Sequence, residues 1–153
     1  MTTIVYVGVR QESASAAFSQ PEVFVEETEN GITRSIPISP DQSLRFRNHS
    51  PDGFEWSYGG SGPAQLALAI LLHAAENYYG LEAGNDWAAC VCEEIDPTDR
   101  PCIVCQGRDE FRKEGTARAL QRYQDFKSSV VAKFQGGGFR LPLSTVIGWL
   151  TVV

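Results

Sequence analysis

The sequence predicts one α+β domain over residues 1–153, in which a small antiparallel sheet is packed by two long helices and a short C-terminal helix. Three observations predict this class. Short runs rich in β-branched residues fill the first third of the chain, two long helical patterns follow, and all four cysteines lie in the segment between those helices. A chain of 153 residues suits a single core.

The first strands are predicted at residues 4–9, 23–28 and 32–36, because each run is rich in β-branched side chains. Asn30-Gly31 separates the second run from the third. This pair favours a type I′ turn, which needs positive φ at both central residues. The sequence therefore predicts a tight hairpin, which Pro37 ends.

Two further strands are predicted at residues 44–49 and 54–58, because apolar and polar side chains alternate there with a period of two. In the first of these runs, Arg45, Arg47 and His49 would share the face that points away from the core. The sheet would then have four or five strands, all from the first third of the chain.

Three helices complete the domain. Residues 63–79 are mostly Ala, Leu and Ile, and Pro63 suits the start of a helix because its missing N–H needs no partner there. Residues 116–134 carry one apolar stripe, and residues 143–150 predict a short last helix. The polar side chains of the first helix share one third of its wheel: Gln65, His73, Glu76 and Asn77.

Four segments resemble a small family of uncharacterised bacterial and phage proteins, a domain of unknown function. They are residues 47–51, 54–72, 123–132 and 141–150. The most specific run is Tyr58-Gly59-Gly60-Ser61-Gly62-Pro63, and Ser57 stands before it where a small residue or glycine is expected. The resemblance implies a fold and a phage or mobile-element context but no activity. Residues 80–115 look like an insertion into that fold.

The cysteines form two close pairs, Cys90-Val91-Cys92 and Cys102-Ile103-Val104-Cys105. Zinc prefers four thiolates in a tetrahedron, so the spacing favours a structural zinc site that organises the lobe at residues 80–115. Two alternatives remain: four reduced structural thiols, or a redox or iron–sulfur site. A four-thiolate zinc site would leave no open position for water.

The glycine turn before the first long helix suggests a second site. Free N–H groups at a helix N-terminus favour an anion. The candidate anion-binding residues are Arg45, Arg47, His49, Gly60, Ser61 and Gly62. The turn matches neither a P-loop nor a dinucleotide fingerprint, and the alternative is a plain strand-to-helix turn with Ser61 as its cap.

The net charge of −6 argues against a general nucleic-acid binder, which needs a basic face. Residues 76–99 contain acids but no Lys or Arg. Surface charge runs of this kind are usually solvated segments, and the functional alternative is an acidic surface that meets a protein partner with a basic surface. No apolar run approaches the length that spans a bilayer and no signal peptide is evident, which predicts a cytoplasmic protein and no membrane partner.

No catalytic motif is complete. Residues 101–105 match the second half of a zinc deaminase signature, but the His-x-Glu that should precede it is missing. The sequence therefore favours a non-enzymatic accessory protein that binds another macromolecule. The alternatives are a small ligand- or nucleotide-binding protein or enzyme that uses the glycine turn, and a nucleic-acid module that uses the basic segment at residues 100–133.

Overall fold

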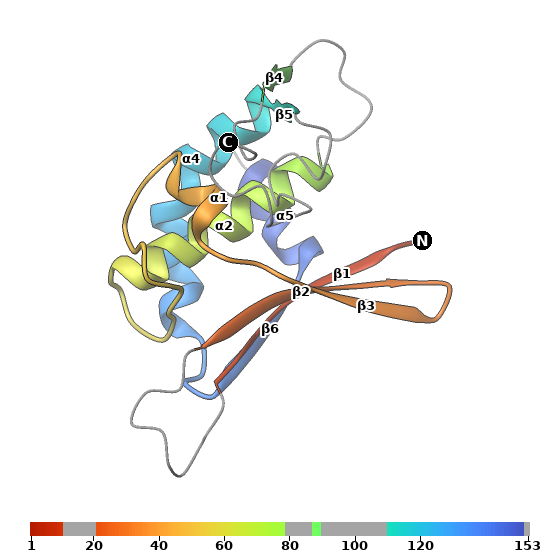
Figure 1. Cartoon of the computed structure of the whole chain (residues 1–153), viewed down its shortest axis with the longest axis horizontal. Coiled ribbons are helices and arrows are strands. Elements are labelled where there is room, and N and C mark those ends of the chain that lie inside the picture. The colour runs from red at the N-terminus through yellow and green to blue at the C-terminus, as the bar shows by residue number, and fades with distance from the viewer. Residues whose placement is uncertain (11–20, 79–86, 90–109, 152–153) are drawn as a thin grey trace.

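The computed structural model describes residues 1–10, 21–78, 87–89 and 110–151. It confirms the predicted α+β class: helices gather on one side of a small antiparallel sheet (Figure 1). The described part of the chain has no helix that is both long and apolar enough to cross a membrane.

The main sheet has the strand order β3-β2-β1-β6, and every neighbouring pair is antiparallel. Its strands are β1 (Thr3–Val9), β2 (Glu22–Glu29), β3 (Ile32–Pro37) and β6 (Gly138–Pro142). Asn30 and Gly31 join β2 to β3 with φ values of 53° and 77°. The predicted type I′ hairpin turn is therefore confirmed.

The fourth strand was predicted in the wrong place. It is β6, from near the C-terminus, and it pairs with β1 so that Leu141 lies opposite Tyr6 and Phe139 opposite Gly8. The Phe139 ring occupies the space that a side chain at position 8 would fill, because a Cβ built there would lie 2.2 Å from the ring. Glycine at position 8 is thus required by the close approach of β6.

Neither residues 44–49 nor residues 54–58 form a strand, which corrects two predictions. The first stretch starts in α1 (Asp41–Leu44), a single helical turn that Ser43 ties to the Pro40 carbonyl at 2.8 Å. In the second stretch Phe54 and Trp56 are buried as predicted. The hydrogen bonds of this stretch go to a helical turn instead of a strand, since the Ser57 N–H donates to Val131.

The helices are α2 (Ser61–Tyr78), α4 (Lys113–Ser129), a short 3₁₀ turn η1 (Val131–Lys133) and α5 (Leu143–Thr151). Residues 116–134 were predicted as one helix, but α4 ends at Ser129 and the chain turns before η1. Within the predicted lobe, β4 (Trp87–Ala89) and β5 (Glu110–Arg112) pair antiparallel, and α4 already begins there.

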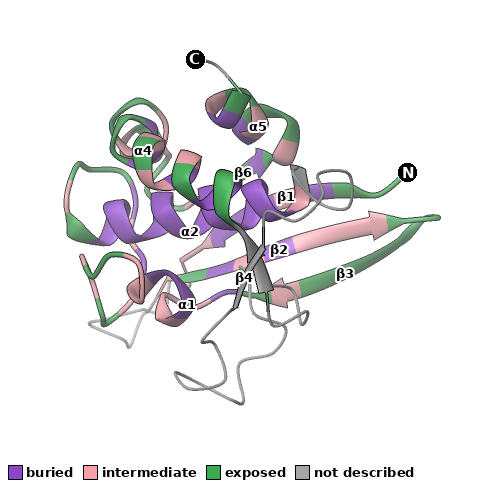
Figure 2. Ribbon diagram, turned by 90° about the horizontal axis from the view of Figure 1, so that it is seen from above, coloured by how far each residue is buried: buried purple, intermediate pink, exposed green. Residues whose placement is uncertain are grey.

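The core is centred on α2. From Gly62 to Glu76 every residue of this helix is buried, which Figure 2 shows as an almost continuous buried ribbon. Around it pack the inward side chains of the sheet, α4 and α5. Trp56, from the stretch before α2, is the largest fully buried side chain among the described residues. The helix is therefore a central scaffold and not a surface element.

Candidate functional site

The structure does not place the three predicted anion-binding basic residues on one strand face. Arg45 is partly buried and its guanidinium lies 4.8 Å from the Phe46 ring. Arg47 is exposed and donates to the Phe46 carbonyl at 2.7 Å. His49 is half-buried and hydrogen-bonded to α4. The face that was predicted from alternation is therefore wrong, because the backbone is not a strand there.

The glycine turn itself is where the sequence placed it, but its helix begins two residues earlier than predicted. Ser61 is the first residue of α2, and the Ala64 N–H donates to the Gly60 carbonyl at 3.0 Å. A Cβ at Gly62 would lie 2.6 Å from the Cβ of Glu55, so packing alone accounts for this glycine. Anion binding at Gly60, Ser61 and Gly62 stays a prediction.

Gln65 is the organising residue of this region, and its role was not foreseen. Its side chain is fully buried. Its Oε1 accepts the N–H groups of His49 at 2.8 Å and Ser50 at 3.1 Å. Its Nε2 donates to the Ser43 hydroxyl at 2.7 Å and to the Arg47 carbonyl at 3.1 Å. All four hydrogen-bonding positions of one amide are therefore used to fix the loop at residues 43–50 on α2.

His49 extends this network to α4. Its Nε2 lies 2.6 Å from the Tyr123 hydroxyl, and the two rings are tilted at 48° with centroids 5.5 Å apart. The loop is thus bound to two helices at once. The imidazole that was predicted to contact an anion has a protein partner.

A second buried polar group lies where α2 crosses β1. The Tyr6 hydroxyl lies 2.8 Å from the Nδ1 of His73, and Asn77 donates to the His73 carbonyl at 2.9 Å. Burial lowers the pKa of His73 to about 4 and raises the pKa of Tyr6 well above its usual value. Both side chains are therefore neutral near pH 7, and Tyr6 can donate to the unprotonated imidazole nitrogen.

The β2–β3 hairpin is the most open described element of the sheet. Its tip extends away from the helices, and β3 is exposed along nearly all its length (Figures 1 and 2). Ile32 at the tip is 70% exposed. This exposure contrasts with β1 and with the part of β2 that the helices cover.

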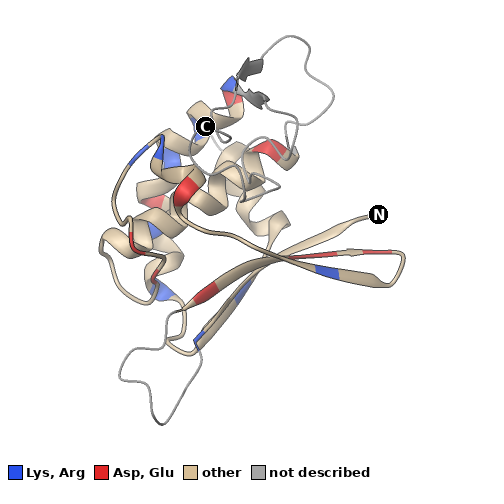
Figure 3. Ribbon diagram, in the orientation of Figure 1, with Lys and Arg blue, Asp and Glu red and all other residues tan. Residues whose placement is uncertain are grey.

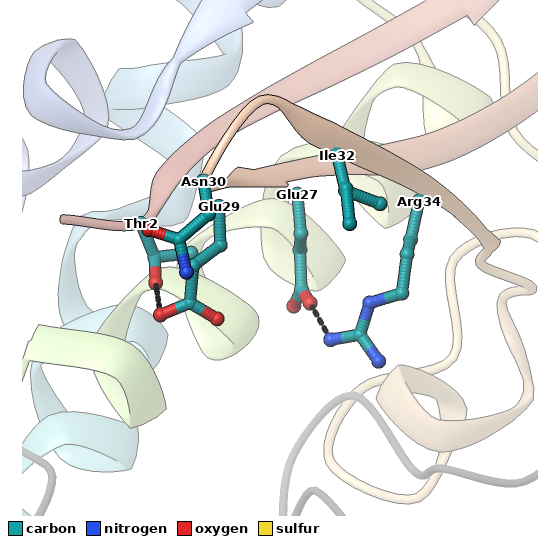
Figure 4. Close-up of a pocket in the computed structure, with 6 residues that line it drawn as sticks. All are labelled: Thr2, Glu27, Glu29, Asn30, Ile32 and Arg34. Atoms are coloured by element: carbon teal, nitrogen blue, oxygen red, sulfur yellow. Dashed lines mark hydrogen bonds and ion pairs between the residues drawn. The ribbon is translucent and has the colours of Figure 1, made fainter.

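A shallow pocket of about 210 Å³ lies on the side of this hairpin that faces the helices (Figure 4). Its lining residues are Thr2, Glu27, Glu29, Asn30, Ile32 and Arg34. Arg34 forms an ion pair with Glu27 at 2.6 Å, and the Thr2 hydroxyl donates to Glu29 at 3.3 Å. The pocket offers carboxylates whose charge is only partly balanced.

The opposite face of the sheet carries another charged pair. Arg140 of β6 reaches over β1 to Glu26 of β2, with the shortest contact at 2.6 Å. This hydrogen bond lowers the pKa of Glu26 and raises that of Arg140. Acidic residues outnumber basic ones on the hairpin (Figure 3).

The four predicted zinc ligands, Cys90, Cys92, Cys102 and Cys105, lie outside the described residues. Among the residues that the structure does describe, no three His, Cys, Asp or Glu side chains gather as metal ligands would. The zinc site therefore stays a prediction.

Comparison with known protein families gives one match. Residues 7–98, more than half of the chain, match a family of unknown function, DUF6166. The chain belongs to this family. Searches among curated proteins and among solved structures found no match.

The DUF6166 match includes the hairpin, the Gln65 network and α2, and it extends through Cys90 and Cys92. It ends before Cys102, and it leaves out α4, β6 and α5. The resemblance that was read from the glycine turn is thus supported as membership of an uncharacterised family, and the match also includes part of the segment that was interpreted as an insertion.

Proposed function

We propose that this DUF6166 protein is a non-enzymatic accessory protein that binds another protein through its β2–β3 hairpin. The observation that carries the proposal is the position of β3. It is an edge strand, exposed nearly throughout, and no described strand pairs with its outer edge. An open strand edge is a template on which a partner can add a strand.

The register identifies the backbone groups that a partner would meet. With a two-residue turn, Glu29 and Ile32 form the first hydrogen-bonded pair, so the bonded pairs recur at every second residue of β3. The N–H and C=O groups of Thr33 and Ser35 then point outward. Pro37 has no N–H to offer, which limits the open edge to about one short strand.

The charge of the hairpin defines the kind of partner. Its residues include Glu22, Glu26, Glu27 and Glu29 against Arg34 alone, and Arg140 of β6 also pairs with Glu26, which leaves a formal charge of −2 on the hairpin. An extended segment with basic side chains would complement both the backbone edge and this charge. The partner is therefore expected to be a protein with a basic extended segment.

Proline at position 35 tests this proposal, because it removes an outward N–H without removing a bond to β2. Ser35→Ala is the matched control, since it keeps the N–H. A partner captured from a host lysate should bind wild type and Ser35→Ala but lose at least about tenfold in affinity for Ser35→Pro. In the purified complex, the Thr33 and Ser35 amides should exchange hydrogen more slowly than in the free protein.

Equal binding by Ser35→Pro, with unchanged exchange at Thr33 and Ser35, would contradict the hairpin proposal. A thermal melt of each variant separates loss of binding from loss of fold. A partner segment without Lys or Arg would contradict the charge argument.

The setting of this function is also a proposal. The resemblance to phage and bacterial proteins supports a phage or mobile-element origin, and action in the cytoplasm is part of the same proposal. Encoding genes that lie consistently among ordinary housekeeping genes would contradict the first point.

Structural zinc completes the proposal. Cys102 and Cys105 have the C-x-x-C spacing that is common in zinc sites, and Cys90 and Cys92, which are separated by one residue, would supply the other two thiolates. Protein purified without added metal should contain about one zinc per chain by elemental analysis, and Cys105→Ser should lower that content. Four thiols that react promptly in the native, metal-free protein would refute it.

A further inference from the structure

The groove between α4 and α5 contains an arginine, Arg122. Arg122, Thr145, Gly148 and Trp149 line a pocket of about 330 Å³ there, a volume at the small end of known ligand sites. No carboxylate of the described residues pairs with Arg122, and its buried Nε has no hydrogen-bond partner among them. The described residues therefore leave hydrogen-bonding capacity of this guanidinium unused.

The guanidinium is nonetheless held in place by an aromatic ring. Its central carbon lies 5.4 Å from the centre of the Trp149 ring, within the range of a cation–π contact. Trp149 is itself fixed by an edge-to-face contact with Phe126, with ring centroids 5.7 Å apart and planes at 71°. Because the Nε is covered, the terminal NH₂ groups are the donors that this side chain can present to a ligand.

Gly148 provides an independent observation at the same pocket. It lies within α5, where glycine is the poorest helix former after proline. Nothing lies within 4 Å of a Cβ built at this position, so packing does not demand glycine. A glycine in the wall of a pocket leaves room for a ligand to approach the helix backbone.

From these observations we propose that the α4–α5 pocket binds a carboxylate group attached to an apolar body. Two terminal guanidinium nitrogens match a carboxylate in a bidentate arrangement, and one arginine balances one negative charge. Thr145, whose side chain carries a hydroxyl donor, lines the same pocket, and Trp149 supplies apolar lining for the body of the ligand. The source of the carboxylate is either a small organic acid or the free C-terminus of a peptide.

N-acetyl-leucine and its uncharged amide are the matched probes for this site. Two-dimensional NMR would follow the indole N–H of Trp149, assigned from its loss in Trp149→Phe. N-acetyl-leucine should shift this signal with millimolar affinity, as expected for a fragment-sized ligand, and the amide should not. An N-acetylated hexapeptide with a free C-terminus, compared with its amidated form, distinguishes the two sources: tighter binding of the peptide indicates a protein C-terminus, and equal binding indicates a small acid.

Three variants localise the binding. Arg122→Gln should weaken it at least about tenfold, because the charge-assisted pair is lost. Gly148→Leu should weaken it as much by filling the pocket, and should not lower the melting temperature, since the space is open and leucine favours helix. Lys127→Gln removes a cation from the same helix outside the pocket and should leave binding unchanged.

Two kinds of result would overturn the proposal. One is the absence of any carboxylate-dependent shift of the Trp149 signal at probe concentrations well above the millimolar range. The other is a loss of binding in Lys127→Gln that equals the loss in Arg122→Gln, which would indicate unspecific attraction of anions to α4.

Discussion

The loop at residues 43–50 and the β2–β3 hairpin use similar polar side chains in opposite ways. The loop is held by the buried amide of Gln65 on α2, which makes four hydrogen bonds to it, and by the contact of His49 with Tyr123. In the hairpin, Arg34 and Glu27 form an ion pair whose arginine side chain is 72% exposed. Buried polar groups contribute to stability because their partners cannot turn to water, whereas exposed pairs can. The loop is therefore a structural element, and the hairpin is free to serve a partner.

The largest effect is expected for Gln65→Leu, which tests whether the buried polar network stabilises the fold. The variant leaves two N–H groups, a hydroxyl and a carbonyl without their partner in a buried site, so the free energy of unfolding should fall by about 3–5 kcal/mol. Denaturant unfolding measures the loss. Gln124→Leu, at an exposed position of α4, is the matched control and should change stability by less than about 0.5 kcal/mol. Similar losses in both variants would mean that the network does not stabilise the fold.

A second buried polar contact should make stability depend on pH. Burial lowers the pKa of folded His73 to about 4 from a normal value of 6.5, so the unfolded chain binds the proton more readily. The free energy of unfolding should therefore be highest above pH 6.5. It should fall by up to about 3 kcal/mol as the pH is lowered towards 4.

Urea unfolding at a series of pH values tests the His73 prediction. His73→Gln can still meet the Tyr6 hydroxyl but does not titrate, so its stability should fall less between pH 6.5 and 4 than that of wild type. Parallel curves for the two proteins would show that His73 is not the responsible group.

The turn before α2 and the hairpin turn both contain a residue with positive φ, so the effect of backbone strain can be compared between the two regions. Ser57 has a φ of 80°, a region that glycine adopts readily and other residues rarely do. Ser57→Gly should therefore raise the free energy of unfolding by about 1 kcal/mol. The reverse change, Gly31→Ser, places a serine at the hairpin position whose φ is 77°. It should lower the free energy of unfolding by a similar amount, and thermal melts measure both changes. A destabilised Ser57→Gly would mean that the serine side chain compensates for the strain.

The smallest effect is expected at the hairpin surface. Arg34→Ala removes an exposed ion pair, and the change in unfolding free energy should be less than about 0.5 kcal/mol. Its effect on binding of a basic partner should be neutral or favourable, because the hairpin becomes more acidic. A stability loss as large as that of Gln65→Leu would show that the hairpin is structural and not open for a partner.

Several features of the fold followed from local sequence. Asn30-Gly31 predicted the turn, and the apolar run of residues 63–79 predicted the buried helix nearly to its ends. Alternation placed Phe54, Trp56 and Tyr58 on one face, but only Phe54 and Trp56 are buried and Tyr58 is exposed. It also did not predict the backbone that carries them. Alternation with a period of two indicates that every second side chain is buried. A stretch with this pattern forms a strand only if a neighbouring strand is present to pair with its backbone.

The candidate sites were less accessible from sequence. Gln65 was visible as a polar residue on an apolar helix, but its four partners lie 15 to 22 positions away along the chain. The α4–α5 pocket combines Arg122 with Gly148 and Trp149, which are brought together only when two helices pack. The edge of β3 is open because β6 pairs with β1, at the opposite side of the sheet, and not with β3. This pairing joins residues that are far apart in the sequence.

The sequence by itself determined the α+β class, the hairpin, the central helix and the resemblance to an uncharacterised family, because these depend on side chains within a few residues of one another. Only the tertiary structure decided that β6 completes the sheet, that His49 contacts Tyr123, and that Arg122 lines a pocket where it pairs with no carboxylate of the described residues. The physical reason is that strand pairing, buried hydrogen bonds and pockets join distant residues, and their free energies arise from burial that a local pattern does not specify.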